Sequence, residues 1–365
     1  MLSQTQQQTD TGPSLESKQR IAAPVMQDFT KRAFQCLGLP AGDATTIADL
    51  IVESDLIGAD AHGIFRLPQY TRRLREGGIN PSPSITVKRT GGATAMVDGD
   101  NGMGHLVMRV ATRTAISLAR ESGVGWVGVR GSNHAGPASL YPAMAVAEGM
   151  IGLYTAVASA NHMAIWGGSE PLLGTNPLAI GIPAGREAPV ILDVATTAVS
   201  YGTIKRYALE GLSIPEGWMV DRQTGAPMTD PQERDRGLLL PMGGYKGSGL
   251  ALVLGLLAGP LNAAAFGREV VDINLDSTSA TNTGHAIIAL DIKRFVEPTE
   301  FKNAVDRFVR DFRQSERLPG VGRIRLPGED RTTRRQDRLS NGIPMAQALR
   351  DTLNDLGASL GIGTI

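Results

Sequence analysis

The sequence predicts a mixed α/β fold in which a helical domain, built from both ends of the chain, accompanies a central α/β domain. Three observations carry this prediction. Apolar residues recur at helical spacing in the first quarter, short apolar runs alternate with helical segments through the middle, and helical spacing returns near the C-terminus. The implied division is a helical domain over 19–80 and 298–365, an α/β domain over 81–297, and a disordered, Gln/Ser/Thr-rich tail over 1–18.

Each expected element follows from a local pattern. In the first quarter, apolar residues stand three and four apart in 24–39 and 43–58, and Gly38 with the Pro-Ala-Gly at 40–42 separates these two helices. Bounded apolar runs predict strands at 93–99, 124–131, 150–159, 177–183, 189–195 and 284–292. Further helices are expected at 104–121, 137–148, 246–267, 298–315 and 344–360.

Composition narrows the class of protein. The 365 residues are 42% hydrophobic and 20% charged, which is typical of a globular chain that can bury a full core. Lys and Arg number 36, as do Asp and Glu, so no net field draws the protein to nucleic acid or to an anionic membrane. The single cysteine, Cys36, excludes an internal disulfide framework, and no apolar run is long enough to span a bilayer. We therefore expect a cytoplasmic protein with neither a nucleic-acid nor a membrane partner.

Two glycine-rich stretches resemble phosphate loops. Gly123–Gly128 formally matches G-x-G-x-x-G, but it follows a predicted helix and lies within a predicted strand, which excludes a Rossmann loop. The stretch 243–249 lacks the hydroxyl of a P-loop, yet Lys246 at the start of a helix would suit a phosphate. The arginine-rich stretch 310–338 is interpreted as a solvated surface, with a dinucleotide phosphate as an open alternative. The five histidines show no paired spacing, so no metal site is expected.

The stretch 59–70 places His62 and Arg66 four residues apart, beside Asp60. If this stretch is helical, both side chains lie on one face. An imidazole moves protons near neutral pH, and a guanidinium holds a carboxylate through two parallel hydrogen bonds. A helix end in which His62 caps the backbone and Arg66 is solvated fits the same residues, so both interpretations stay open at this point.

Five stretches occur in an order that resembles the type-2 malate/L-lactate dehydrogenase family. They are GADAHGIFRLPQYTRRLREGGINP (58–81), GSNHAGPASLYPAMAVAEGMIGL (131–153), WGGSEPLLGTNPLAIGIPAG (166–185), PMGGYKGSGLALVLGLLAGPLNAAAFG (241–267) and RLPGED (325–330). The resemblance covers about 25–360. It implies a non-Rossmann NAD(P)-binding domain, NAD or NADP as cofactor, a small-molecule carboxylate as substrate, and a homodimer with the active site near the interface.

The resemblance also implies roles for individual residues. His62 matches the proton-donating histidine of the family and Arg66 its carboxylate-binding arginine. His134 matches a second catalytic histidine, which is a proton acceptor in some members and a cofactor contact in others. The matched substrate-binding positions are Tyr201, Gly202 and Thr203. The matched cofactor-lining positions are His134, Ala135, Gly136, Pro137, Ala138, Ser159, Thr175, Asp193, Val194, Ala195, Tyr245, Lys246, Arg325, Pro327, Gly328 and Glu329.

Two departures from the family pattern bear on the substrate. Ala61 stands where a serine commonly orients the catalytic histidine, which leaves Asp60, a water or another residue to orient His62. Thr203 stands where cyclic-imine reductases carry an aspartate and many hydroxy-acid dehydrogenases a lysine; a threonine cannot balance an iminium cation.

The sequence therefore favours an NAD(P)-dependent dehydrogenase that transfers a hydride between nicotinamide and a 2-hydroxy or 2-oxo acid. A pyrroline- or piperideine-2-carboxylate reductase is the alternative. A catalytically weakened dinucleotide-binding homologue is an alternative of another class.

Overall fold

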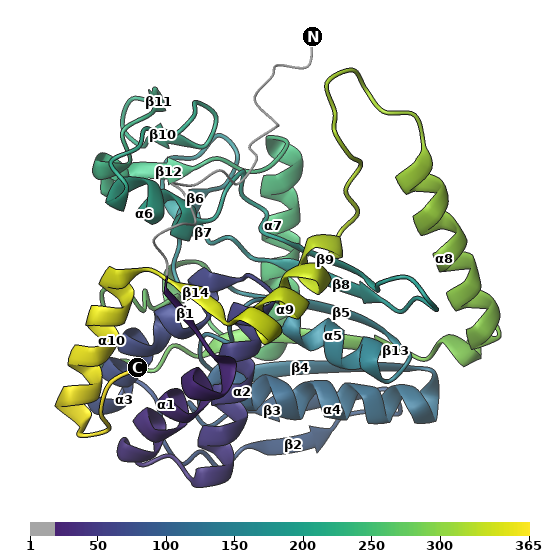
Figure 1. Cartoon of the computed structure of the whole chain (residues 1–365), viewed down its shortest axis with the longest axis horizontal. Coiled ribbons are helices and arrows are strands. Elements are labelled where there is room, and N and C mark those ends of the chain that lie inside the picture. Colours follow the sequence, from purple (N-terminus) through teal and green to yellow (C-terminus); the bar gives the residue numbers. More distant parts are fainter. Residues whose placement is uncertain (1–18) are drawn as a thin grey trace.

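The computed structural model describes residues 19–365, and the tail expected over 1–18 lies outside the described residues. Its centre is one sheet with strand order β2-β3-β4-β13-β5-β8-β9 (Figure 1). The strands are β2 Thr86–Arg89, β3 Thr94–Asp98, β4 Val124–Ser132, β5 Ile151–Ala156, β8 Leu178–Ile182, β9 Val190–Val194 and β13 Thr283–Leu290. In this sheet of the described chain only β3 and β4 run parallel, whereas Rossmann sheets are parallel throughout. The predicted mixed α/β, non-Rossmann fold is confirmed.

Helices cover both faces of this sheet. Helices α4 Gly104–Ser122 and α5 Leu140–Ala147 pack on one face, and α7 Tyr245–Ala258 packs on the other (Figure 1). Glycines in β4 let the two layers approach closely: a Cβ on Gly125 would lie 2.1 Å from the carbonyl oxygen of Ala115 in α4, and one on Gly128 would lie 2.1 Å from Asn262 Oδ1 behind the sheet. Gly125 and Gly128 of the apparent phosphate loop are therefore packing residues within a strand, which confirms that this stretch is no Rossmann loop.

The two ends of the chain share one helical core. It is formed by α1 Ala23–Cys36, α2 Ala41–Leu56, α3 Leu67–Arg75 and α10 Gln347–Leu360. Strand β1 Gln19–Ile21 pairs antiparallel with β14 Ile343–Met345, which joins the N-terminal and C-terminal segments directly. The helices expected over 24–39, 43–58 and 344–360 are confirmed. The last one begins three residues late because β14 occupies its expected start.

Two further helices follow the sheet. Helix α8 Pro298–Gln314 stands at the edge of the molecule, apart from the helical core (Figure 1). Its buried Asp306 accepts hydrogen bonds from the backbone N–H groups of 185–187. Helix α9 Glu329–Asn341 lies within the arginine-rich stretch, and its Arg338 is only 7% exposed. The interpretation of 310–338 as a solvated surface holds for most of α9 but is wrong for Arg338, whose buried partners gave no signal in the local pattern.

A small lobe completes the chain, and the sequence did not predict it. Helix α6 Tyr201–Leu209 packs on a sheet of order β11-β10-β12, formed by β10 Met219–Asp221, β11 Pro227–Met228 and β12 Gly237–Leu239 (Figure 1). Strands β6 Met163–Ala164 and β7 Pro171–Leu173 pair nearby. Short 3-10 turns are η5 Pro231–Arg236, η6 Pro260–Asn262, η7 Gly267–Glu269 and η8 Ile292–Arg294. The helix expected over 246–267 ends at Ala258 because Gly259 and Pro260 follow. Between residues 19 and 365, no helix combines the length and apolarity needed to cross a membrane.

Candidate active site

The segment that carries His62 and Arg66 is not one helix, so the expectation of a shared helical face is wrong. It consists of two 3-10 turns, η3 Asp60–His62 and η4 Ile64–Arg66, separated by Gly63 in an extended conformation. The buried carboxyl of Asp55 accepts a hydrogen bond from Ile64 N at 2.8 Å. A Cβ on Gly63 would lie 2.1 Å from Asp55 Oδ1, so only glycine fits there. The break in the helix is therefore dictated by a carboxyl buried beneath it.

Helix α9 holds this turn from the C-terminal end of the chain. The Arg338 guanidinium donates to the backbone carbonyl of Asp55 and to the Asp60 carboxylate, with Nη2 3.2 Å from Oδ2. Asp60 is thus engaged by Arg338 and not by His62. Burial raises the pKa of Asp55 well above its usual value, since the Ile64 N–H opposes this only in part. The carboxyl acts as a neutral brace beneath His62 and Arg66.

Two imidazoles face each other in this region. The His62 and His134 rings are nearly parallel, with centroids 5.6 Å apart and planes inclined by 13°. His134 Nδ1 accepts from Gly136 N at 3.3 Å and lies 2.6 Å from the Tyr70 hydroxyl. An amide N–H only donates, so Nδ1 is the acceptor, Tyr70 donates to it, and the proton of neutral His134 is on Nε2. His134 therefore offers a donor, not a base, at Nε2.

Both imidazoles are neutral at neutral pH. Burial lowers the pKa of His62 to about 4; the charge of Arg66 adds to this effect and Asp193 opposes it. Burial, followed by Arg66 and His62, lowers the pKa of His134 well below its ordinary value. A neutral His62 is able to accept a proton from a bound hydroxyl group.

Arg66 is a fixed cation without an acidic partner. Its Nε donates to the carbonyl oxygen of Ala61 at 2.9 Å, and its Nη1 donates to Gln69 Oε1 at 3.0 Å. No carboxylate of the described residues lies within ion-pair distance of this guanidinium, and burial lowers its pKa. Since an unpaired buried charge is unfavourable, the guanidinium favours an anion from outside the chain. Arg66 stands four residues from His62 and is suited to hold a carboxylate beside it.

The structure brings many of the matched cofactor positions together at the end of β9. Asp193 Oδ2 accepts from Ser139 N, at 3.1 Å, which closes the turn formed by 134–138. It also accepts from Arg331 of α9 at 3.1 Å. The carbonyl of Pro327 accepts from Ile191 N at 3.1 Å, which sets the segment 327–329 beside the same strand.

A second group of matched positions surrounds the start of α7. The Thr175 carbonyl accepts from Thr196 N at 2.9 Å, one residue beyond Ala195, and the Thr196 carbonyl accepts from Met242 N, also at 2.9 Å. The chain then enters α7 through two left-handed glycines, with Tyr245 and Lys246 exposed and no side chain capping the helix. Free N–H groups beside a lysine suit the phosphates of a dinucleotide.

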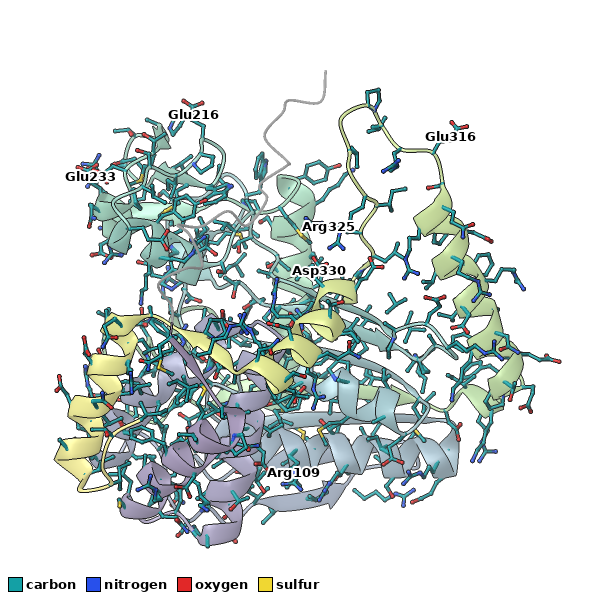
Figure 2. All side chains as sticks on the ribbon, in the orientation of Figure 1. Arg109, Glu216, Glu233, Glu316, Arg325 and Asp330 are labelled. Carbon is teal, nitrogen blue, oxygen red and sulfur yellow. The ribbon has the colours of Figure 1, made fainter. Side chains whose placement is uncertain are left out.

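Ser159, Arg325 and Thr203, which the resemblance also matched, lie outside these two groups. The Ser159 carbonyl accepts from Ile273 N at 3.2 Å, near the substrate side of the site. Arg325 is exposed and lies 3.8 Å from Asp330, on the segment that leads into α9 (Figure 2). Among the substrate positions, Thr203 Oγ1 is 3.0 Å from the Ser200 hydroxyl, which caps α6.

Gly202 lies against the turn that carries His62. A Cβ on Gly202 would lie 3.5 Å from the Cβ of Ala61, so α6 packs closely against the turn that carries His62. The Tyr201 hydroxyl donates to Asp235 at 3.3 Å, and its ring stacks on His162 with centroids 3.7 Å apart. Tyr201 therefore presents its ring and not a free hydroxyl.

Sequence reasoning missed several residues that build this site. Tyr70, which orients His134, stands at the end of the stretch that first drew attention, eight residues after His62. Asp55 and Arg338 had no local signal, because each is informative only once the chain has folded. The loop 272–281 was not singled out at all.

Comparisons with known proteins show what this chain is similar to. The family model described as malate/L-lactate dehydrogenase matches residues 21–354. The chain is 34% identical over 350 residues to the malate dehydrogenase of Pyrococcus horikoshii, covering 94% of this chain and 96% of that protein. It is 37% identical to the L-sulfolactate dehydrogenase of Methanothermobacter thermautotrophicus, covering 94% and 98%. The solved delta1-piperideine-2-carboxylate reductase of Pseudomonas syringae superposes with a TM-score of 0.82 at 31% identity, covering 93% and 99%.

Proposed function

Because the chain belongs to the malate/L-lactate dehydrogenase family, we propose that it is an oxidoreductase that transfers a hydride between a nicotinamide cofactor and C2 of a 2-hydroxy or 2-oxo acid. One observation carries the proposal: a neutral imidazole, His62, stands four residues from a partly buried guanidinium, Arg66, that has no acidic partner among the described residues. These are the two groups that such a reaction requires of the protein.

In the oxidation direction, Arg66 holds the substrate carboxylate through two hydrogen bonds and so fixes the adjacent C2 hydroxyl against His62. His62 accepts the hydroxyl proton as the hydride leaves C2. A bound nicotinamide supplies or accepts that hydride. His134 donates from Nε2 to an oxygen of the substrate or to the cofactor amide, with its ring held by Tyr70.

In the reduction direction, His62 must carry a proton first. The carboxylate of the substrate neutralises Arg66, which removes one of the charges that lower the pKa of His62. Substrate binding thus raises the pKa of His62 and prepares it to donate. The same residue serves both directions because its protonation follows the charge of its neighbour.

The residues around β9 and the start of α7 fit NAD or NADP. The proposal is supported by the hydrogen bonds that bring 134–139 and 327–329 beside β9, and Lys246 with the uncapped start of α7 would hold phosphate.

We also propose a cytoplasmic homodimer, as the family resemblance implies. Phe308 and Phe312 of α8 stack on each other, although they are 49% and 58% exposed. An exposed aromatic pair on a helix that stands apart from the core is typical of a surface that another copy covers. A single cysteine and the use of a nicotinamide pool both suit a reducing compartment.

The test is a panel of 2-oxo acids, 2-hydroxy acids and cyclic imines assayed with both cofactors. We expect turnover of at least one 2-oxo acid, followed as NADH or NADPH absorbance. A higher kcat/KM for pyrroline-2-carboxylate than for every 2-oxo acid would instead make the protein an imine reductase. Tight cofactor binding without any turnover would make it the weakened homologue.

A further inference from the structure

A second cation without an acidic partner lies on the substrate side of the site. The Lys205 ammonium, on α6, donates to Asn274 Oδ1 at 3.1 Å and lies 5.4 Å from the centroid of the Tyr201 ring. No aspartate or glutamate of the described residues is within 4.0 Å of it. The side chain is half-buried. Lys205 is thus placed as Arg66 is, with polar neighbours but no counter-charge.

The two cations are joined by a short chain of hydrogen bonds. Arg66 Nη1 donates to Gln69 Oε1 at 3.0 Å, and Gln69 Nε2 points on to Asn274 Oδ1 at 3.4 Å. The same oxygen accepts from Lys205. Burial lowers the pKa of Lys205, and the charge of Arg66 is the next largest cause, so the two groups repel each other across this chain. Asp272 and Asp235 offset the repulsion from a distance without forming an ion pair with Lys205.

Asn274 is fixed with its oxygen toward the cations. Asp272 Oδ1 accepts both from Asn274 N at 2.8 Å and from Asn274 Nδ2 at 2.7 Å. With its amide hydrogens turned to Asp272, the side chain offers its oxygen to Lys205 and Gln69. This oxygen positions the ammonium through one hydrogen bond.

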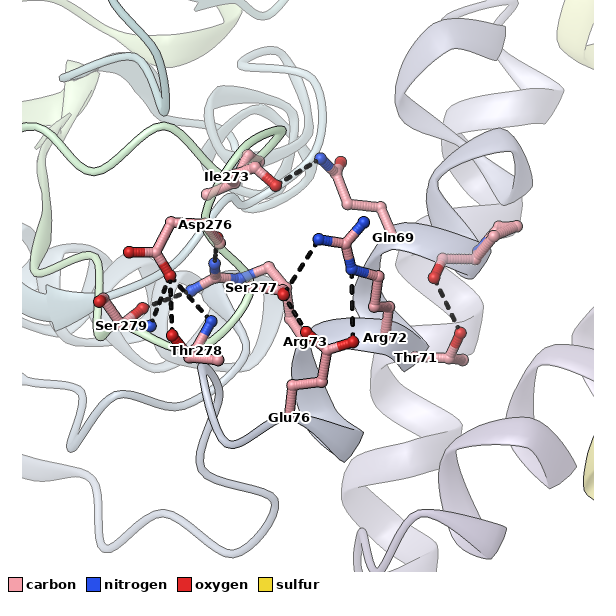
Figure 3. Close-up of polar contacts among 11 residues, drawn as sticks. Gln69, Thr71, Arg72, Arg73, Glu76, Ile273, Asp276, Ser277, Thr278 and Ser279 are labelled. Carbon is pink, nitrogen blue, oxygen red and sulfur yellow. Dashed lines mark hydrogen bonds and ion pairs between the residues drawn. The ribbon is translucent and has the colours of Figure 1, made fainter.

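The loop that carries Asn274 is itself tied to α3. Figure 3 shows Gln69 bonded to the carbonyl of Ile273, and Arg73 reaching the same loop. The buried Arg73 guanidinium donates to the carbonyls of Asp276 and Ser279. Because α3 follows directly on the turn that carries Arg66, this loop, which contacts Lys205 through Asn274, is held in a fixed place relative to Arg66.

We propose that Lys205 is a specificity-determining residue of this chain: its ammonium binds a second anionic group at the far end of the substrate and so selects dianionic over monoanionic 2-hydroxy or 2-oxo acids. Arg66 holds the carboxylate next to the reacting carbon, and Lys205 holds the distal group. A dianion neutralises both cations at once, whereas a monoanion leaves Lys205 unpaired and a cationic iminium would be repelled by it. The inference rests on the proposed function and adds the residue that selects among its substrates.

The test compares Lys205→Met with the wild type on matched substrate pairs. One member ends in a carboxylate or a sulfonate and the other in a methyl group: oxaloacetate and 3-sulfopyruvate against 2-oxobutanoate. We expect Lys205→Met to lower kcat/KM for the dianions by about 10- to 100-fold, the effect of losing one charge-assisted hydrogen bond. The methyl-ended acid should change by less than about threefold. Of oxaloacetate and 3-sulfopyruvate, the one whose kcat/KM falls more in Lys205→Met carries the distal group that Lys205 binds more strongly.

Arg206→Met is the matched control. It removes a cation from the next residue of α6, where Arg206 pairs with Glu210 and not with the site. This variant should leave the ratio of kcat/KM for the dianions to kcat/KM for 2-oxobutanoate unchanged. Lys205→Arg should keep part of the preference for the dianions that Lys205→Met loses. An equal loss for both substrate types in Lys205→Met, or the same loss in Arg206→Met, would overturn the proposal.

A binding measurement separates this inference from the proposed function. Succinate should raise the melting temperature of the cofactor-free wild type more than butyrate does, and Lys205→Met should remove this difference. Absence of any difference in the wild type would contradict the second anion site. If succinate stabilises through Lys205 but no 2-oxo acid turns over, the anion site is supported and the proposed function is the part that fails.

Discussion

The two cations of the site are held in different ways. Arg66 lies on a turn whose backbone is fixed by the buried Asp55 and clamped by Arg338 from α9, and its guanidinium is bonded on two sides. Lys205 lies on a nine-residue helix, with one hydrogen bond and one ring contact. One cation is immobilised by the protein, and the other is positioned but free to adjust.

The surroundings of the two cations differ in the same sense. The turn that carries Arg66 joins the large helical core formed by both ends of the chain. Helix α6 rests on a small cluster of buried side chains: Ile204, Ile214, Met219, Met228 and Leu239. A group that orients the reacting carbon tolerates little displacement, whereas a group that selects among substrates can accommodate them. The contrast indicates that chemistry is located on the rigid side and selectivity on the small lobe.

The largest expected effect tests whether the rigid side does carry the chemistry. We predict that His62→Ala lowers kcat by about 100-fold or more, the usual scale for loss of a general acid–base group. Cofactor affinity, followed by NADH fluorescence, should be nearly unchanged. A variant that loses cofactor binding but keeps turnover per bound complex would move His62 out of the proton-transfer role.

The pH dependence sharpens the same prediction. The pKa of His62 is lowered to about 4 in the ligand-free protein, so the imidazole is a free base above that pH and is protonated below it. For hydroxy-acid oxidation, kcat/KM should therefore stay level from neutral pH down to about pH 5 and fall below it. A fall of kcat/KM that begins near pH 6.5 would show that burial does not lower the pKa of His62 as inferred.

Arg66→Lys compares the two cations directly. The substitution keeps the charge but loses the planar fork, so we expect kcat/KM to fall by about 10- to 100-fold for every carboxylate substrate. The reverse exchange, Lys205→Arg, should cost less than about fivefold because an ammonium position needs no fork. Equal losses of kcat/KM in the two variants would contradict the inference that Arg66 is fixed and Lys205 is adjustable.

The brace beneath Arg66 is tested by two substitutions of Asp55. Asp55→Ala leaves the buried Ile64 N–H without an acceptor and should destabilise the fold by about 1–3 kcal/mol. Asp55→Asn keeps a neutral oxygen in place and should retain most of the stability and activity, since the carboxyl is held neutral by burial. Denaturant unfolding and kcat/KM report the two effects. A large loss of activity in a stable Asp55→Asn would assign a charge-dependent role to this residue.

The sequence predicted the regular parts of this molecule and several residues that the structure gathers at the candidate site. Periodic stretches such as 104–121 and 284–292 became α4 and β13, because alternation and helical spacing report directly on which face is buried. His62, Arg66 and His134 came together as the resemblance implied. These features depend on short stretches of chain.

What the sequence did not predict depends on contacts between distant segments. The 3-10 turns at 60–66 replace a helix because Asp55 and Arg338 meet beneath them, although 283 residues separate those two. Lys205 went unnoticed since its meaning comes from Asn274, which lies 69 residues further on. Local periodicity contains no record of such pairs.

The smallest expected effect is the dependence of folding stability on acid pH that comes from His105. His105 lies behind Tyr70, with ring centroids 5.6 Å apart, and is fully buried with both ring nitrogens unpartnered among the described residues. Burial lowers its pKa to about 3, so the unfolded chain binds more protons than the folded one between about pH 6.5 and 3. Stability is therefore complete above pH 6.5 and falls with acid, by about 1.4 kcal/mol per pH unit for each such histidine.

His105→Leu separates this effect from the hydrogen-bonded histidines. The ring has no hydrogen-bond partner to lose, so the substitution should leave the free energy of unfolding at pH 7 within about 1 kcal/mol of the wild type. It should also reduce the fall of stability with acid by the contribution of one histidine. His285, equally buried, lies 2.8 Å from the Tyr154 hydroxyl and 3.1 Å from Ser132 Oγ, so His285→Leu should destabilise the fold at pH 7 as well. Urea unfolding at pH 5 and pH 7 compares the two variants. If His105→Leu kept the full dependence of stability on acid pH, that dependence would arise from the other buried histidines, His62, His134 and His285.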